Sequence, residues 1–114
     1  MIWRIPVFGK NLTHIRVAVV YSKKNPRCYY VSIDPVEVKG DLIIFPLCMG
    51  EALPLISVTR ASKTKEKEAI ARVEQEIRSN TGAVWDKVKI VASRNNLELI
   101  TNVSPLLEAN ATND

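Results

Sequence analysis

The spacing of apolar residues changes from a period of two to a period of about 3.6 near residue 60, and this change constrains the fold more than any other feature of the chain. Before it, apolar residues alternate with other residues over 13–22, as in a strand with one buried face. After it, the segment 62–79 carries an apolar stripe at helical spacing on an otherwise charged background. We therefore expect a single α+β domain over 1–101, with a flexible C-terminal tail over 102–114.

We expect an antiparallel sheet of four to six strands, most of which come from residues 2–60. Strands are expected over 2–8, 13–22, 27–33 and 42–45, and the second and third of these form a hairpin. Pro35 is expected to end or bend the third strand, with 36–39 as its continuation, because proline has no N–H to donate. The apolar run 42–45 predicts a strand buried on both faces. Residues 48–55 contain Gly50 and Pro54 and are expected to form a loop before a short strand at 55–59.

One long helix is predicted over about 62–79, covering one face of the sheet. Ser62 or Thr64 is expected to cap its start. Its apolar stripe, which we expect to pack on the sheet, consists of Ala69, Ile70, Val73 and Ile77. Glu68, Arg72 and Glu76 lie on the opposite face of the helical projection and are expected to tolerate replacement. The segment 83–100 fits either a short C-terminal helix or a hairpin, with a final strand at 97–101.

The net charge of +4 is concentrated in the first half of the chain. Residues 1–50 contain seven Lys or Arg and three acidic residues, whereas 51–114 contain nine of each. The longest apolar run falls short of the roughly 20 residues that cross a bilayer, and the first residues do not resemble a secretion signal. We expect a cytoplasmic protein without a membrane partner, in which Cys28 and Cys48 remain unpaired.

Motifs for catalysis are weak. His14 is the single histidine and has no nucleophile at a recognised spacing, so we expect it to be a polar strand residue. Glu37 and Lys39 match half of a metal-dependent nuclease pattern, but no acidic residue precedes Asp34, and we expect a solvated turn here. The four glycines are isolated, which excludes a glycine-rich phosphate loop. The sequence therefore predicts a protein that is not an enzyme and has no cofactor or metal.

The basic hairpin is the strongest functional signal in the sequence. Its expected binding residues are Arg16, Lys23, Lys24, Arg27 and Tyr29. Basic side chains neutralise phosphates, and aromatic rings stack on unpaired bases. We expect a small accessory protein that binds nucleic acid or a nucleoprotein complex through this surface. The alternative is a protein interaction module, such as an inhibitor, an assembly subunit or a homodimer, without nucleic-acid contact. A metal-dependent nuclease is a distant third.

Overall fold

The computed structural model describes residues 2–9, 11–46, 50–99 and the backbone of 106–107. Its elements, in chain order, are β1 (Ile2–Phe8), β2 (His14–Ser22), β3 (Cys28–Lys39), β4 (Leu42–Ile44), β5 (Glu51–Ser57), α1 (Lys63–Ser79), α2 (Gly82–Arg94), β6 (Glu98–Leu99) and β7 (Leu106–Leu107). The predicted α+β class is confirmed, because strands and helices are segregated along the chain.

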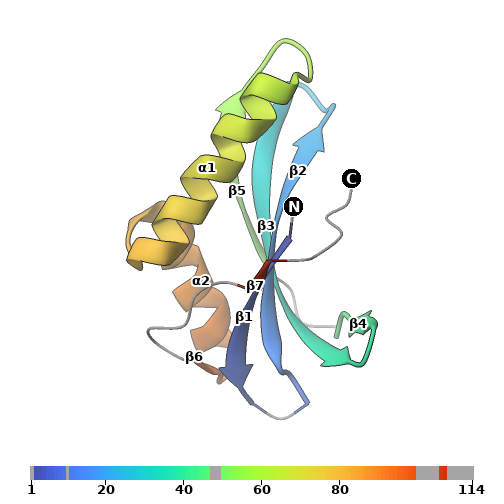
Figure 1. Ribbon diagram of the computed structural model, residues 1–114, viewed down its shortest axis with the longest axis vertical. Helices are drawn as coiled ribbons and strands as arrows, with labels where there is room; N and C mark the ends of the chain where they lie inside the picture. The colour runs from blue at the N-terminus through green and yellow to red at the C-terminus, as the bar shows by residue number, and fades with distance from the viewer. Residues whose placement is uncertain (1, 10, 47–49, 100–105, 108–114) are drawn as a thin grey trace.

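The strands form one twisted antiparallel sheet with both helices on the same side (Figure 1). Its order is β4-β3-β2-β1-β6, with β5 also paired to β3 and β7 to β1. β2 and β3 pair along their whole shared length, from Ser22 opposite Cys28 to His14 opposite Val36. The turn of this predicted hairpin and the start of α1 lie at one end of the molecule, and the β3–β4 hairpin extends at the other (Figure 1).

The core lies between the sheet and the two helices. Alternate residues of β1, β2 and β3 point into it, including Trp3, which is 2 % exposed. On α1 the buried residues are Ala69, Val73 and Ile77, with Ile70 packed against them at the edge. The predicted helical stripe is therefore part of the core.

Helix α1 begins at the predicted cap, since the Ser62 Oγ accepts a hydrogen bond from the Lys65 N–H at 3.1 Å. Helix α2 begins differently, because Thr81 makes no side-chain capping bond. Instead, Glu76 of α1 reaches across, and its Oε1 accepts the Val84 N–H at 2.8 Å. Gly82, with φ of +95°, leaves the room for this carboxylate, which a β-carbon at that position would meet. Glu76 is therefore a link between the two helices and not a free surface residue.

The sequence leaves open whether the third strand ends or bends at Pro35, and the predicted continuation over 36–39 is confirmed, because β3 runs on to Lys39. Pro35 lies opposite Ile15 of β2, whereas β5 pairs with Cys28–Ile33 and β4 only from Glu37 onward, so neither of these two strands needs an N–H at Pro35. Two local predictions in the sheet are wrong. Residues 51–54 belong to β5 and not to a loop, and Pro54 is tolerated beside a register shift at Tyr29/Tyr30, while the predicted short strand at 55–59 is present over 55–57.

The second error concerns β4, which is not buried on both faces. Leu42 is 65 % exposed, Phe45 52 % and Ile44 39 %. A continuous apolar run predicts a strand, but it does not show whether other elements reach far enough to cover it.

Of the two alternatives for the segment 83–100, the structure contains the helix and not the hairpin. Residues 82–94 form α2, and the predicted final strand, 97–101, is present over Glu98–Leu99 as β6, which pairs with Val7 and Phe8 of β1; residues 100 and 101 lie outside the described residues. Of the predicted tail, 102–114, the structure describes only Leu106–Leu107, whose backbone pairs with β1. Among the described residues, no helix combines the length and the apolar character that a membrane span requires.

Candidate nucleic-acid interface

Two chain segments meet at the end of the molecule where β2 turns into β3. They are the β2–β3 turn, 23–27, and the connection 58–62 that leads from β5 into α1. The Arg27 Nη1 donates to the Thr59 carbonyl oxygen at 2.9 Å, and the Val58 N–H donates to the Arg27 carbonyl oxygen at 3.0 Å. A shallow surface hollow of about 440 Å³ lies between the segments. These contacts fix the position of the turn relative to the start of α1.

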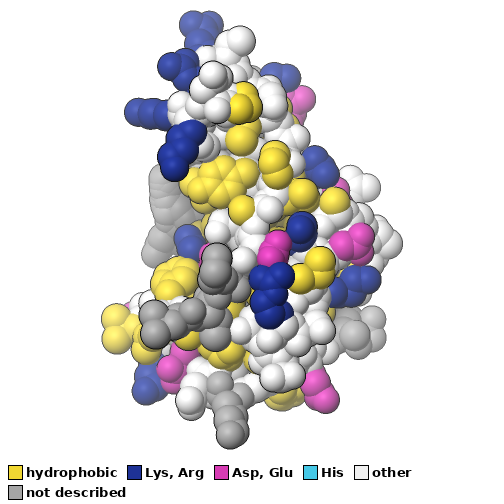
Figure 2. Space-filling model, turned by 180° about the vertical axis from the view of Figure 1, so that it is seen from behind, with side chains coloured by type: hydrophobic (Ala, Val, Ile, Leu, Met, Phe, Trp, Pro, Cys, Tyr) yellow, Lys and Arg dark blue, Asp and Glu magenta, His cyan; other side chains and the backbone are white. Residues whose placement is uncertain are grey.

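This arrangement gathers basic side chains from both segments, together with the first residue of α1, into what we call the basic end. It consists of Lys23, Lys24, Arg27, Arg60 and Lys63, all of them exposed. Within the described residues, none of the five forms an ion pair with an acidic side chain. Figure 2 shows Lys and Arg side chains gathered at this end. Glu66 is the acidic residue in the first turn of α1, and the positive end of that helix faces the same region.

The predicted basic residues divide into two groups. Lys23, Lys24 and Arg27 lie together at the basic end. Arg16 lies six residues before Ser22 on β2, which at 3.3 Å per residue is about 20 Å away. Its guanidinium pairs with Asp34 at 3.9 Å and stacks on the Phe45 ring at 5.1 Å. Arg16 is therefore separate from the basic end.

Tyr29 is buried, with 3 % exposure. Its ring lies 5.1 Å from that of Tyr21, and its hydroxyl donates to the Ser62 carbonyl oxygen and accepts the Ser62 N–H. This position ties β3 to the start of α1 and presents no ring face to a base. The sequence contains a signal for it, because Tyr29 has the same alternation phase as the buried Val31 and Ile33.

The binding surface predicted from the sequence does not include Arg60 and Lys63. More than 30 positions separate them from Arg27 along the chain, and only the pairing of β5 with β3 brings them to the same end. Conversely, Arg4 and Lys39 of the basic first half lie on other parts of the sheet, and Lys39 pairs with Glu37 at 3.7 Å. The positive surface thus comes from both halves of the chain and not from the first half alone.

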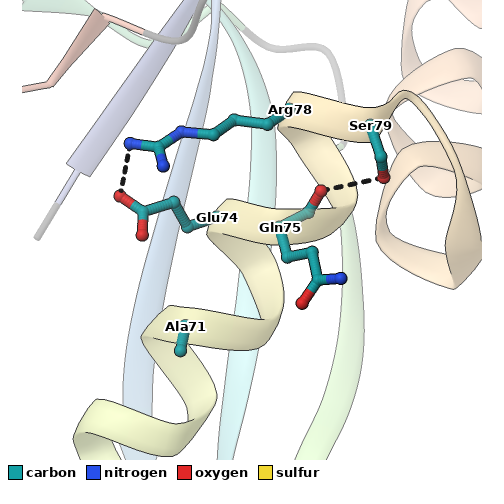
Figure 3. A pocket seen from close by; sticks show the side chains of 5 residues that line it. All are labelled: Ala71, Glu74, Gln75, Arg78 and Ser79. Carbon is teal, nitrogen blue, oxygen red and sulfur yellow. Dashed lines mark hydrogen bonds and ion pairs between the residues drawn. The ribbon is translucent and has the colours of Figure 1, made fainter.

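Another surface hollow lies along the exposed side of α1, with a volume of about 540 Å³. Arg78 points back to Glu74, and the Ser79 hydroxyl is turned toward the Gln75 carbonyl oxygen (Figure 3). The Arg78–Glu74 ion pair measures 3.0 Å, and the hydrogen bond that Ser79 donates to Gln75 measures 2.9 Å. The lining residues all come from this one helix, and their polar groups bond to one another. This hollow therefore offers no convergent groups for binding or catalysis.

The remaining sequence candidates stay dispersed. His14 bonds to the Thr13 hydroxyl at 2.9 Å, and burial, followed by the nearby charge of Arg4, lowers the pKa of the His14 imidazole. Asp34 accepts a hydrogen bond from Ser32 and pairs with Arg16, away from the Glu37–Lys39 pair. Within the described ranges, no three His, Cys, Asp or Glu side chains come together as a metal site would require. Cys28 is a free thiol, and Cys48 lies outside the described residues.

Comparison of the chain with protein-family models, with curated proteins and with solved structures found no match.

Proposed function

We propose that this protein is an accessory protein that binds nucleic acid, alone or within a nucleoprotein complex, through the basic end. One observation carries the proposal: Lys23, Lys24 and Arg27 are joined there by Arg60 and Lys63 from a distant part of the sequence. The absence of ion-pair partners for these side chains within the described part of the chain leaves their charges available to phosphates.

The expected binding is electrostatic and depends strongly on salt. Each phosphate neutralised on a single strand contributes about −0.7 to the slope of log K against log salt. Five contacts from the basic end give a slope of about −3.5, which is roughly a 100-fold loss of affinity between about 50 and 200 mM salt. Such a slope distinguishes binding by the basic end from nonspecific adhesion through one or two side chains.

The test compares two charge-reversed triple variants by fluorescence anisotropy with a labelled oligonucleotide. The first carries K23E, K24E and K63E at the basic end; Arg27 is kept because its guanidinium holds the Thr59 carbonyl. The control carries K39E, R78E and K89E, which are exposed and lie elsewhere. Each reversal changes the charge by two, so both variants move from +4 to −2.

The proposal expects the first variant to lose binding and the control to keep most of it, because local charge and not net charge determines phosphate contact. The salt slope of any residual binding in the first variant should fall to about −1.4, the value for two contacts. Equal affinities of the two variants would contradict the proposal.

A protein interaction module is the second candidate, and the β3–β4 hairpin favours it. Leu42, Ile44 and Phe45 are exposed together at the end of the molecule opposite the basic end. Exposed apolar side chains that cluster in this way are common at protein interfaces. A wild-type protein that binds no nucleic acid at low salt would favour this candidate over the first.

A further inference from the structure

Tyr30 stands on the sheet face that is turned away from both helices. Strand alternation places it opposite to the buried Tyr29, and it is partly exposed. Its cross-strand neighbours are Val20 on β2 and Pro54 on β5, both of which have short apolar side chains. The Tyr30 hydroxyl makes no hydrogen bond within the described residues. The core therefore does not account for an aromatic residue at this position.

A row of small side chains lies between Tyr30 and the basic end. The row of residues between them consists of Ser22, Cys28 and Ser57, which lie opposite one another on β2, β3 and β5. All three have small side chains. Tyr30 is three residues from Arg27, or about 10 Å along the strand. Figure 2 shows hydrophobic side chains directly beside the gathered Lys and Arg side chains.

From this placement we infer that the ligand of the basic end is single-stranded nucleic acid, with a base stacked on the Tyr30 ring; this inference rests on the proposed function. A strand held by its phosphates at Lys23, Lys24 and Arg27 passes over the small residues and reaches Tyr30 with the next bases. Stacking on a ring requires an unpaired base, because the bases of a duplex are already stacked on each other. The positive charge beside the apolar ring favours this ligand over an apolar protein segment.

The test measures affinity and salt slope for a single-stranded oligonucleotide and for the matched duplex, with the full chain. The variants are Tyr30→Ala, Tyr30→Val and Tyr30→Phe; the β-branched valine suits a strand and guards against a folding defect in the alanine variant. Phe8→Val, at the far end of the sheet and also an exposed aromatic, is the matched control.

Tyr30→Ala and Tyr30→Val should bind the single strand about 5-fold to 150-fold more weakly, the range for one stacked base. Their salt slopes should equal that of the wild type, since stacking releases no counterions. Tyr30→Phe and Phe8→Val should bind like the wild type, and duplex binding should not change.

Unchanged single-strand binding in both Tyr30→Ala and Tyr30→Val would overturn the inference, and so would an equal loss in Tyr30→Phe. In those cases the K23E, K24E and K63E variant still tests the basic end separately. A wild type that binds no nucleic acid at low salt overturns the proposed function, and the inference with it.

Discussion

Removing the Glu76 side chain tests how the two helices are held together. In the structure the Glu76 carboxylate serves two partners, the Val84 N–H at 2.8 Å and the Arg72 Nε at 3.0 Å. Glu76→Ala leaves the start of α2 without a capping acceptor, because Thr81 supplies none. The variant should therefore destabilise the whole domain and not only the surface of α1.

The expected cost follows from the two contacts. Loss of a helix cap costs about 0.5 to 2 kcal/mol, and hydrogen bonds to charged groups contribute about 1.5 to 3 kcal/mol. The Arg72 pair, which is partly exposed, adds at most about 0.5 kcal/mol. We therefore expect Glu76→Ala to lower the free energy of unfolding by about 2 kcal/mol, which at a urea m-value of about 2 kcal/mol/M shifts the midpoint by about 1 M.

The assay is urea unfolding followed by circular dichroism, with Glu74→Ala as the matched control. Glu74 pairs with Arg78 on the exposed side of the same helix, so its loss should cost no more than about 0.5 kcal/mol. Thr81→Asp, which adds an acceptor at the N-cap of α2, should restore part of the stability of Glu76→Ala. Equal midpoints for Glu76→Ala and Glu74→Ala would refute the capping role of Glu76.

Two further predictions concern the core and the pH dependence of stability. Val73→Ala and Ile77→Ala should each cost roughly 1 to 4 kcal/mol in urea melts at two protein concentrations, and a change in oligomeric state without a loss of stability would contradict their core position. Because burial and Arg4 lower the pKa of His14 below 6.5 in the folded state, its contribution to stability is present above about pH 6.5 and is lost as pH falls through the folded pKa. The urea midpoint of His14→Gln should therefore differ less between about pH 5 and 7.5 than the midpoint of the wild type does. Identical pH profiles of the wild type and His14→Gln would exclude this contribution.

The sequence predicted those elements whose pattern depends on local contacts. The alternation in 13–22 and the stripe of 62–79 each report one buried face, and the structure contains β2 and α1 at these places. The Ser62 cap was also predictable, because its bond reaches only as far as Lys65. Such features depend on residues within one turn or one strand of each other.

Features that depend on distant pairing were not predictable in the same way. Pro54 argues against a strand unless one knows that, among the described residues, β5 pairs with β3 alone. Glu76 lies on the polar side of the helical projection, and only the return of the chain at Gly82 places the Val84 N–H beside it. In both cases the deciding contact comes from another element.

The candidate interface shows the same division. The turn at Lys23 and Lys24 was visible in the sequence, whereas Arg60 and Lys63 join it only through the pairing of β5 with β3. The alternation of β3 requires Tyr29 and Tyr30 to point to opposite faces, and Tyr29 shares the phase of the buried residues. Tyr30 is therefore the aromatic residue that the sequence pattern itself favours as the outward one.

The most direct test of binding at the basic end is a map of contacts by nuclear magnetic resonance. Backbone amide shifts of the labelled protein would be followed while a single-stranded oligonucleotide is added at low salt. We expect the largest changes over 22–30 and 57–64, the segments that meet at the basic end, with the amides of 37–46 and 82–94 unchanged. Changes confined to 37–46, or no changes at all, would contradict nucleic-acid binding through the basic end.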